Sequence, residues 1–333
     1  MSRHLRVLTA LFPGLVAGLF ALPASAASLD ALPDNGWVSW QVPSAAKGDG
    51  PCCYEVRGGE PSRRGCRLGK DDPQPTEPAL EAAHGADGEL VIYLKRKAGR
   101  STALHALGGS CPVSLDGPLQ ALGAMDPARS IAFLDAQLEP GTDGLGRQPL
   151  LMAIAHHAEP SAARRLVART APGEAKAIRR DALFWLGQLH PAAGLDALLR
   201  SARSDPSREI RHHALFSLSQ AEVDAARAAL RDYAGDRSVD GEDRGQALFW
   251  LAQSGDPGAR GAILAALRGG EDALIEQAVF ALSQLGEGAD EALIELVEGP
   301  YPRQARKRAL FWLGQSGSKT ALGYLDRVLA GSD

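Results

Sequence analysis

The sequence predicts a mainly α protein, an α-solenoid of about six helical hairpins preceded by a small β module stapled by disulfides. One heptapeptide recurs in the second half of the chain at intervals of 32, 33, 31 and 31 residues, with copies that begin at Ala182, Ala214, Ala247, Ala278 and Ala309. A fixed period of this length is typical of stacked structural units. The four cysteines lie only in the first third of the chain. A solenoid offers long surfaces rather than a central pocket, so binding is favoured over catalysis.

The N-terminus predicts export. Arg3 and Arg6 precede an apolar run from Val7 to Leu22, and small residues follow up to Ala26. This pattern is typical of a removable secretory signal over residues 1–26. The run is shorter than the roughly 20 residues of a membrane span. We therefore expect a periplasmic or secreted protein with no stable membrane insertion after signal cleavage.

Net charge argues against nucleic acid as a partner. The whole chain carries a formal charge of -4, and loss of Arg3 and Arg6 with the signal gives -4 - 2 = -6. A mildly acidic protein has no general attraction to phosphate backbones. With 45% hydrophobic residues, the remaining chain can bury a substantial core.

The cysteines are predicted to form two disulfides. Cys52, Cys53, Cys66 and Cys111 all follow the predicted export signal, and an even number in a Gly- and Pro-rich segment of an exported chain favours disulfides. The neighbours Cys52 and Cys53 would form a strained ring with each other. Each is therefore expected to pair with Cys66 or Cys111, in an order that the sequence leaves open. A zinc site is the weaker alternative, because the spacing fits no known zinc motif.

The region between the signal and the repeats, residues 27–125, is predicted to be β-rich. Large and polar residues alternate from Trp37 to Val42, and a second run from Glu89 to Ala106 is broken at Ala98-Gly99, which indicates an antiparallel hairpin. Between these runs, residues 48–78 are rich in Gly and Pro and offer little core. Residues 126–139 begin with Asp126-Pro127 and are expected to form a helix that caps the first repeat.

Residues 140–333 are predicted to form the helical hairpins. In the best-defined repeat, a first helix runs from about Ala175 to Leu189 and a second from Gly194 to Arg203. A diverged sixth copy, Leu150 to His156, lies one period upstream.

These repeats resemble the HEAT-repeat family in its short bacterial, phycobilisome-lyase form. The resemblance rests on the Arg-x-x-Ala-Leu starts at Arg211 and Arg306 and on the Gly-Asp-Pro turn at Gly255, and it implies a protein-binding α-solenoid. One enzyme class of that family, the deoxyhypusine hydroxylases, binds iron through His-Glu dipeptides, and this chain has none. Relatives that attach bilins work inside the cell, which the export signal disfavours.

Helical geometry sorts the positions of the heptapeptide. At 100° per residue its two Leu positions face the second helix, and the Trp position lies on one flank, where it can contact the neighbouring repeat. The third and seventh positions point away from the second helix. They either fill the seam between successive first helices or form a ladder that binds a peptide or a partner's helix. The candidate protein-binding residues are Phe184, Gln188, Phe216, Gln220, Phe249, Gln253, Phe280, Gln284, Phe311 and Gln315.

Catalytic, cofactor and metal sites are not predicted. The pairs His156-His157 and His212-His213 lie two repeats apart and are expected to be packed or solvated rather than to share a metal. The sequence therefore favours an exported, non-catalytic scaffold or adaptor that binds another periplasmic or envelope protein. The alternative is an enzyme or ligand carrier whose site lies where the β module meets the first repeats, with His105, His156 and His157 as its polar residues.

Overall fold

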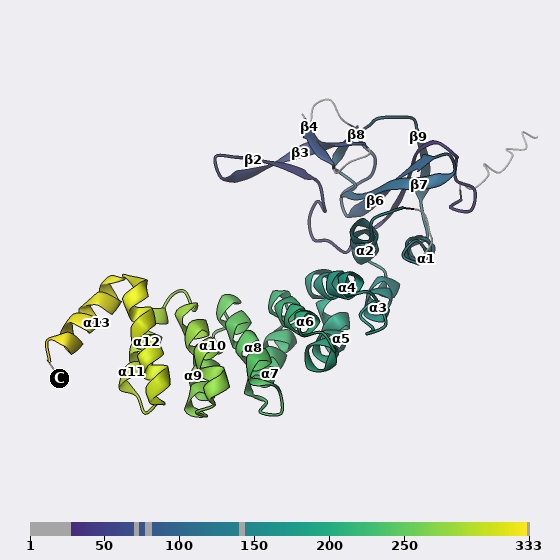
Figure 1. The fold of residues 1–333 in the computed structure, drawn as a ribbon. Helices are drawn as coiled ribbons and strands as arrows, with labels where there is room; N and C mark the ends of the chain where they lie inside the picture. Colours follow the sequence, from purple (N-terminus) through teal and green to yellow (C-terminus); the bar gives the residue numbers. More distant parts are fainter. Residues whose placement is uncertain (1–27, 70–72, 77–81, 140–143, 332–333) are drawn as a thin grey trace, which may run out of the picture.

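The computed structural model describes residues 28–69, 73–76, 82–139 and 144–331. The predicted signal peptide lies outside these residues. All described strands fall between Gly36 and Ala124, and helices follow from Pro127 onward. The predicted fold class is confirmed: an array of helical hairpins follows a small β region (Figure 1).

The first sheet has the strand order β7-β6-β1-β9. It comprises β1 (Gly36–Pro43), β6 (Glu89–Lys97), β7 (Arg100–Gly108) and β9 (Leu119–Ala124). The predicted hairpin is β6–β7, which pairs antiparallel. Its turn residues Ala98 and Gly99 have φ values of 49° and 75°. Two positive φ values in a two-residue turn match the right-handed twist of the flanking strands.

Alternate residues of this sheet face two different cores, because successive side chains of a strand point to opposite faces. Val38, Trp40 and Ile92 join the core that continues into the helices. Trp37 and Tyr93 instead pack over the cysteines in a second, smaller core. The core of the helical array therefore extends without a break onto one face of the sheet.

The second sheet contains a hairpin that the sequence analysis did not predict. β2 (Cys53–Arg57) and β3 (Glu60–Leu68) are joined at Gly58-Gly59, both with positive φ. Its other strands are β4 (Gln74–Thr76), β5 (Ala82–Ala83) and β8 (Pro112–Leu115).

Both disulfides lie in this part of the fold. Cys52 bonds to Cys111 and Cys53 bonds to Cys66, so each adjacent cysteine pairs separately, as predicted. The Sγ atoms of Cys52, Cys66 and Cys111 lie within 4.8 Å of one another. All four thiols are used in the two disulfides, an arrangement that leaves no thiolate to bind zinc.

A buried hydrogen-bond chain joins the sheet to the helices. The helix α1 (Pro127–Ala136) is capped by Asp126, which accepts from the backbone N–H of Arg129. Trp40 Nε1 in β1 donates to Ser130 Oγ in α1 at 2.8 Å. Ser130 Oγ lies 2.8 Å from Nε2 of His157, which follows α2 (Arg147–Ala155). Through Ser130, the predicted capping helix is thus hydrogen-bonded to the sheet on one side and to the end of α2 on the other.

The repeat array consists of stacked hairpins whose first and second helices form two layers (Figure 1). The diverged repeat is α2 with α3 (Pro160–Ala168), and the predicted best-defined repeat is α4 (Lys176–Leu189) with α5 (Pro191–Ser204). The remaining helices are α6 (Arg208–Gln220), α7 (Asp224–Gly235), α8 (Gly241–Gln253), α9 (Ala259–Arg268), α10 (Asp272–Ser283), α11 (Ala289–Glu298), α12 (Arg303–Ser316) and α13 (Lys319–Leu329). In Figure 1 the first helices lie on the side of the array that is nearer to the β2–β3 hairpin.

The seams between successive first helices alternate in character. α4 packs closely on α6, and α8 on α10, where Gly187 and Gly245 face the neighbouring helix. The α6–α8 and α10–α12 seams pack less extensively, and there Trp250 and Trp312 lie against the preceding repeat. The fourth position of the heptapeptide accordingly alternates between Trp and a small residue along the array.

Within the described residues, no helix has both the length and the apolar character needed to cross a membrane.

Candidate functional site

An unbroken column of aromatic rings follows the first helices from one end of the array to the other. Neighbouring ring centroids in this column lie between 4.9 and 6.5 Å apart. The aromatic column consists, in order, of His156, Trp185, Phe184, Phe216, Trp250, Phe249, Phe280, Trp312 and Phe311. These distances are typical of favourable ring pairs, so the column couples each repeat to the next.

The Phe position shows features of both arrangements that the sequence left open. Phe184, Phe216 and Phe249 are half-buried, because each packs on a ring of an adjacent repeat. Exposure increases toward the C-terminus, where the side chains of Phe280 and Phe311 are 36% and 51% exposed. The rings therefore fill part of the seam and also present apolar area to solvent.

The Gln position forms a polar border beside these rings. Gln188, Gln220, Gln253 and Gln315 are exposed, and Gln284 is half-buried. Gln253 Nε2 lies 3.5 Å from Gln284 Oε1, which places two amides of successive repeats side by side. An amide carries both donors and an acceptor, so this border can hydrogen-bond to the peptide groups of an extended chain.

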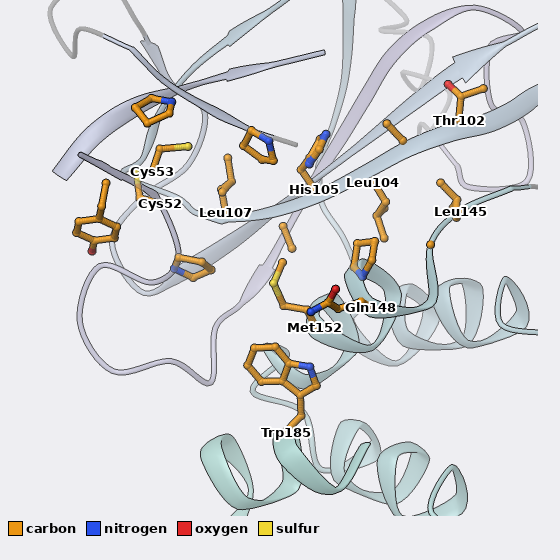
Figure 2. A pocket seen from close by; sticks show the side chains of 18 residues that line it. Cys52, Cys53, Thr102, Leu104, His105, Leu107, Leu145, Gln148, Met152 and Trp185 are labelled. Atoms are coloured by element: carbon orange, nitrogen blue, oxygen red, sulfur yellow. The ribbon is translucent and has the colours of Figure 1, made fainter. Parts of the chain in front are cut away.

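An open cleft of about 800 Å³ lies where the β region meets the first repeats (Figure 2). Its upper wall is strand β7, including His105 and Leu107, and its lower wall is the start of α2, including Gln148 and Met152. The disulfide-bonded segment from Pro51 to Tyr54 closes one side. Trp185 of α4 lies below Met152 and also belongs to the aromatic column.

The histidines proposed for the junction do not meet in this cleft. His105 lines it, but His156 and His157 are absent from its described lining. His156 is nearly buried, places its ring 5.1 Å from that of Trp185, and lies with Nδ1 2.8 Å from the carbonyl oxygen of Met152. The alternative hypothesis of a site at the junction therefore predicted the position of a pocket correctly. Its prediction that three histidines line this pocket was wrong.

His157 is fully buried and its hydrogen bonds are satisfied. Nδ1 lies 2.7 Å from the carbonyl oxygen of Ala153, which can only accept, so Nδ1 carries the proton. Nε2 then accepts from the Ser130 hydroxyl, whose oxygen accepts from Trp40. Burial lowers the pKa of His157 to about 4, because a buried imidazolium would lose its hydration. This neutral histidine holds the two parts of the fold together.

The second histidine pair has a carboxylate neighbour that the sequence analysis did not foresee. Asp243 of the next repeat lies 2.8 Å from Nε2 of His212, and its other oxygen accepts from Arg211 Nε at 2.6 Å. This carboxylate belongs to the following repeat, so the pattern within a single repeat could not predict it. Asp243 forms an ion pair between repeats, because one of its oxygens is bound by the Arg211 guanidinium.

Comparisons with known proteins add little to this geometry. No protein-family model and no curated protein matches the chain. One similar solved structure is the complex of CpcE and CpcF of phycocyanin lyase from Nostoc sp. PCC7120, with 21% identity and a TM-score of 0.30. The match covers 60% of this chain and 78% of that chain. A likeness this weak carries no argument, and the chain's own stacked hairpins establish it as a helical repeat protein.

Proposed function

We propose that this protein is an exported, non-catalytic scaffold that binds an extended segment or helix of another periplasmic or envelope protein along its first helices. The aromatic column with its border of glutamines is the observation that carries the proposal. Exposed rings supply apolar contact area, and amides beside them supply hydrogen bonds to a main chain. The predicted export signal and the two disulfides support an exported protein.

The junction cleft favours binding over chemistry. Among its described lining residues there is no Asp, Glu, Lys or Arg. General acid–base or nucleophilic catalysis needs a reactive group with a partner that activates or orients it. His105 is accompanied there by apolar side chains and uncharged polar groups, which suit recognition. The enzyme alternative therefore has weaker support than the scaffold.

Photo-crosslinking tests the binding surface directly. A photoreactive amino acid at Gln253, which is exposed beside the aromatic column, should give a discrete adduct with a partner protein in the native host. The same amino acid at Ala225, exposed on the second helix α7, is the matched control and should give none. Equal adduct patterns from both positions, or no adduct at Gln253 with a folded protein, would contradict the proposal.

Export is tested separately on the mature protein. We expect the N-terminal residue of the purified native protein, determined by mass spectrometry, to be Ala27, and we expect the protein in the periplasmic or extracellular fraction. A retained Met1 with all of the protein in the cytosol would exclude the exported scaffold.

A further inference from the structure

The junction cleft shares residues with the aromatic column. Met152 occupies the Phe position of the diverged first repeat, and it lines the cleft. Trp185 lines the cleft as well, and its ring lies 5.0 Å from that of Phe184. The cleft therefore lies at the N-terminal end of the surface that the first helices present, and one chain could occupy both.

The chemistry of the cleft selects an uncharged occupant. In a protein with 23% charged residues, the described lining consists of Pro, Leu, Ala and Met side chains, two disulfide-bonded cysteines, four side chains with uncharged polar groups and His105. A charged group that entered would lose part of its hydration and find no Asp, Glu, Lys or Arg among these residues. A large apolar side chain would instead gain contact with Met152, Leu107 and the ring of Trp185.

Polar groups at the rim favour a polypeptide over a lipid. Gln148 and Thr102 line the cleft and are exposed. Both can exchange hydrogen bonds with peptide groups that flank an inserted side chain. Beyond Trp185 the glutamine border continues along the array, and an acyl chain offers it no hydrogen-bonding group.

We propose that the cleft is the anchor pocket of the scaffold: it receives one large uncharged side chain, aromatic or aliphatic, of the partner's extended segment. The residues that follow the anchor then lie along the aromatic column. The inference rests on the proposed function and names the feature that the partner must carry. Tyr54 of β2 lines the cleft and is 50% exposed, and Val56, two residues further along the same strand, is 68% exposed.

Defined peptides test the anchor. The probes are fluorescein-labelled dodecapeptides of Gly, Ser and Gln that differ only in a central Trp, Leu, Glu or Lys, and binding to the disulfide-intact mature protein is read by fluorescence anisotropy. We expect the Trp and Leu peptides to bind at least about tenfold more tightly than the Glu and Lys peptides. Equal affinities for all four, or no binding below about 1 mM for the Trp and Leu peptides, would overturn the inference.

Matched variants place the site. Met152→Glu puts a carboxylate into the cleft, and exposed Gln148→Glu does so at the rim with little risk to folding. Both substitutions should weaken binding of the Trp peptide by about tenfold or more. Leu322→Glu, an exposed apolar residue of α13 outside the cleft, should leave binding unchanged. If both cleft variants are folded by circular dichroism and bind normally, the pocket is elsewhere. Displacement of the peptide by a fluorescent fatty acid that binds more tightly would assign the cleft to lipid instead.

The same variants separate this inference from the proposed function. If the crosslink from Gln253 is present and is lost in the Gln148→Glu protein, both proposals stand. A crosslink that persists unchanged in that variant leaves the scaffold and removes the anchor. Absence of any crosslink from Gln253 removes the scaffold itself.

Discussion

Gly187 and Gly314 occupy the same position of two identical heptapeptides, ALFWLGQ. A Cβ built on Gly187 would lie 2.5 Å from the carbonyl oxygen of Ser217 in α6, which is a backbone atom. A Cβ on Gly314 would meet nothing within 4 Å. Substituting each glycine by alanine thus makes the same local change in two different tertiary surroundings.

The two substitutions are expected to change the free energy of unfolding differently. Alanine is favoured over glycine in a helix interior by about 0.5 to 1 kcal/mol, so Gly314→Ala should raise the free energy of unfolding by about that amount. Gly187→Ala has the same local gain, but α4 and α6 must separate to admit the methyl group. Overpacking of this kind costs about 1 to 3 kcal/mol. We therefore expect Gly187→Ala to be neutral or destabilising by up to about 2.5 kcal/mol.

Urea unfolding followed by the helical circular dichroism signal measures the overall difference between the two variants. Because repeat arrays can unfold in parts, hydrogen exchange of α4, α6 and α12 should accompany it. Protection should fall in α4 and α6 for Gly187→Ala and should rise in α12 for Gly314→Ala. If both substitutions stabilise their helices equally, α4 and α6 are not in the close contact described above, and the reasoning fails.

Three further predictions concern the groups that hold the fold together. Lowering the pH from 6.5 to about 4 should lower the free energy of unfolding by up to about 3 kcal/mol through His157, because this histidine binds its proton near pH 6.5 in the unfolded chain and only near pH 4 in the folded protein. In His157→Gln the urea midpoint should lose this part of its pH dependence. An unchanged pH profile in that variant would contradict the assignment. The double substitution Cys52→Ser and Cys111→Ser should destabilise the β2–β3 region by about 4 kcal/mol and leave the helical circular dichroism signal intact. Peptide mapping of the unsubstituted protein checks the disulfides directly, and any other pairing would refute the connectivity. Arg179→Met should lower the free energy of unfolding in urea by about 3 to 5 kcal/mol, because Asp205, which is 4% exposed, would keep a buried charge without its cation. Adding Asp205→Asn to this variant should recover most of the lost stability. No recovery would show that the two side chains are not coupled.

Patterns of neighbouring residues predicted the helical hairpins and one β-hairpin. The heptapeptide period predicted the stacked hairpins because each copy must place its leucines toward its own second helix. Ala98-Gly99 between alternating residues predicted the β6–β7 hairpin in the same way. The β2–β3 hairpin carries an equivalent signal, Gly58-Gly59, but the surrounding Gly and Pro residues are also typical of irregular chain and mask it.

The candidate site was only partly predictable. Periodicity identified the Phe and Gln positions, but it could not show that Trp250 and Trp312 bridge alternate seams and make the rings continuous. The cleft brings together β7, α2, the disulfide-bonded segment and Trp185. These segments are distant along the chain, and no local pattern marks them as neighbours.

The sequence by itself determined the repeat unit, the face of each helix that is buried and the residues that recur on the opposite face. These properties follow from a 3.6-residue helical period and from copies that share the same local energetics. Tertiary structure alone decided how closely each pair of first helices approaches, which cysteines pair and where the cleft opens. The two ALFWLGQ copies show the physical reason: identical residues receive different contacts when one has a following repeat packed on its glycine and the other stands at the end of the array.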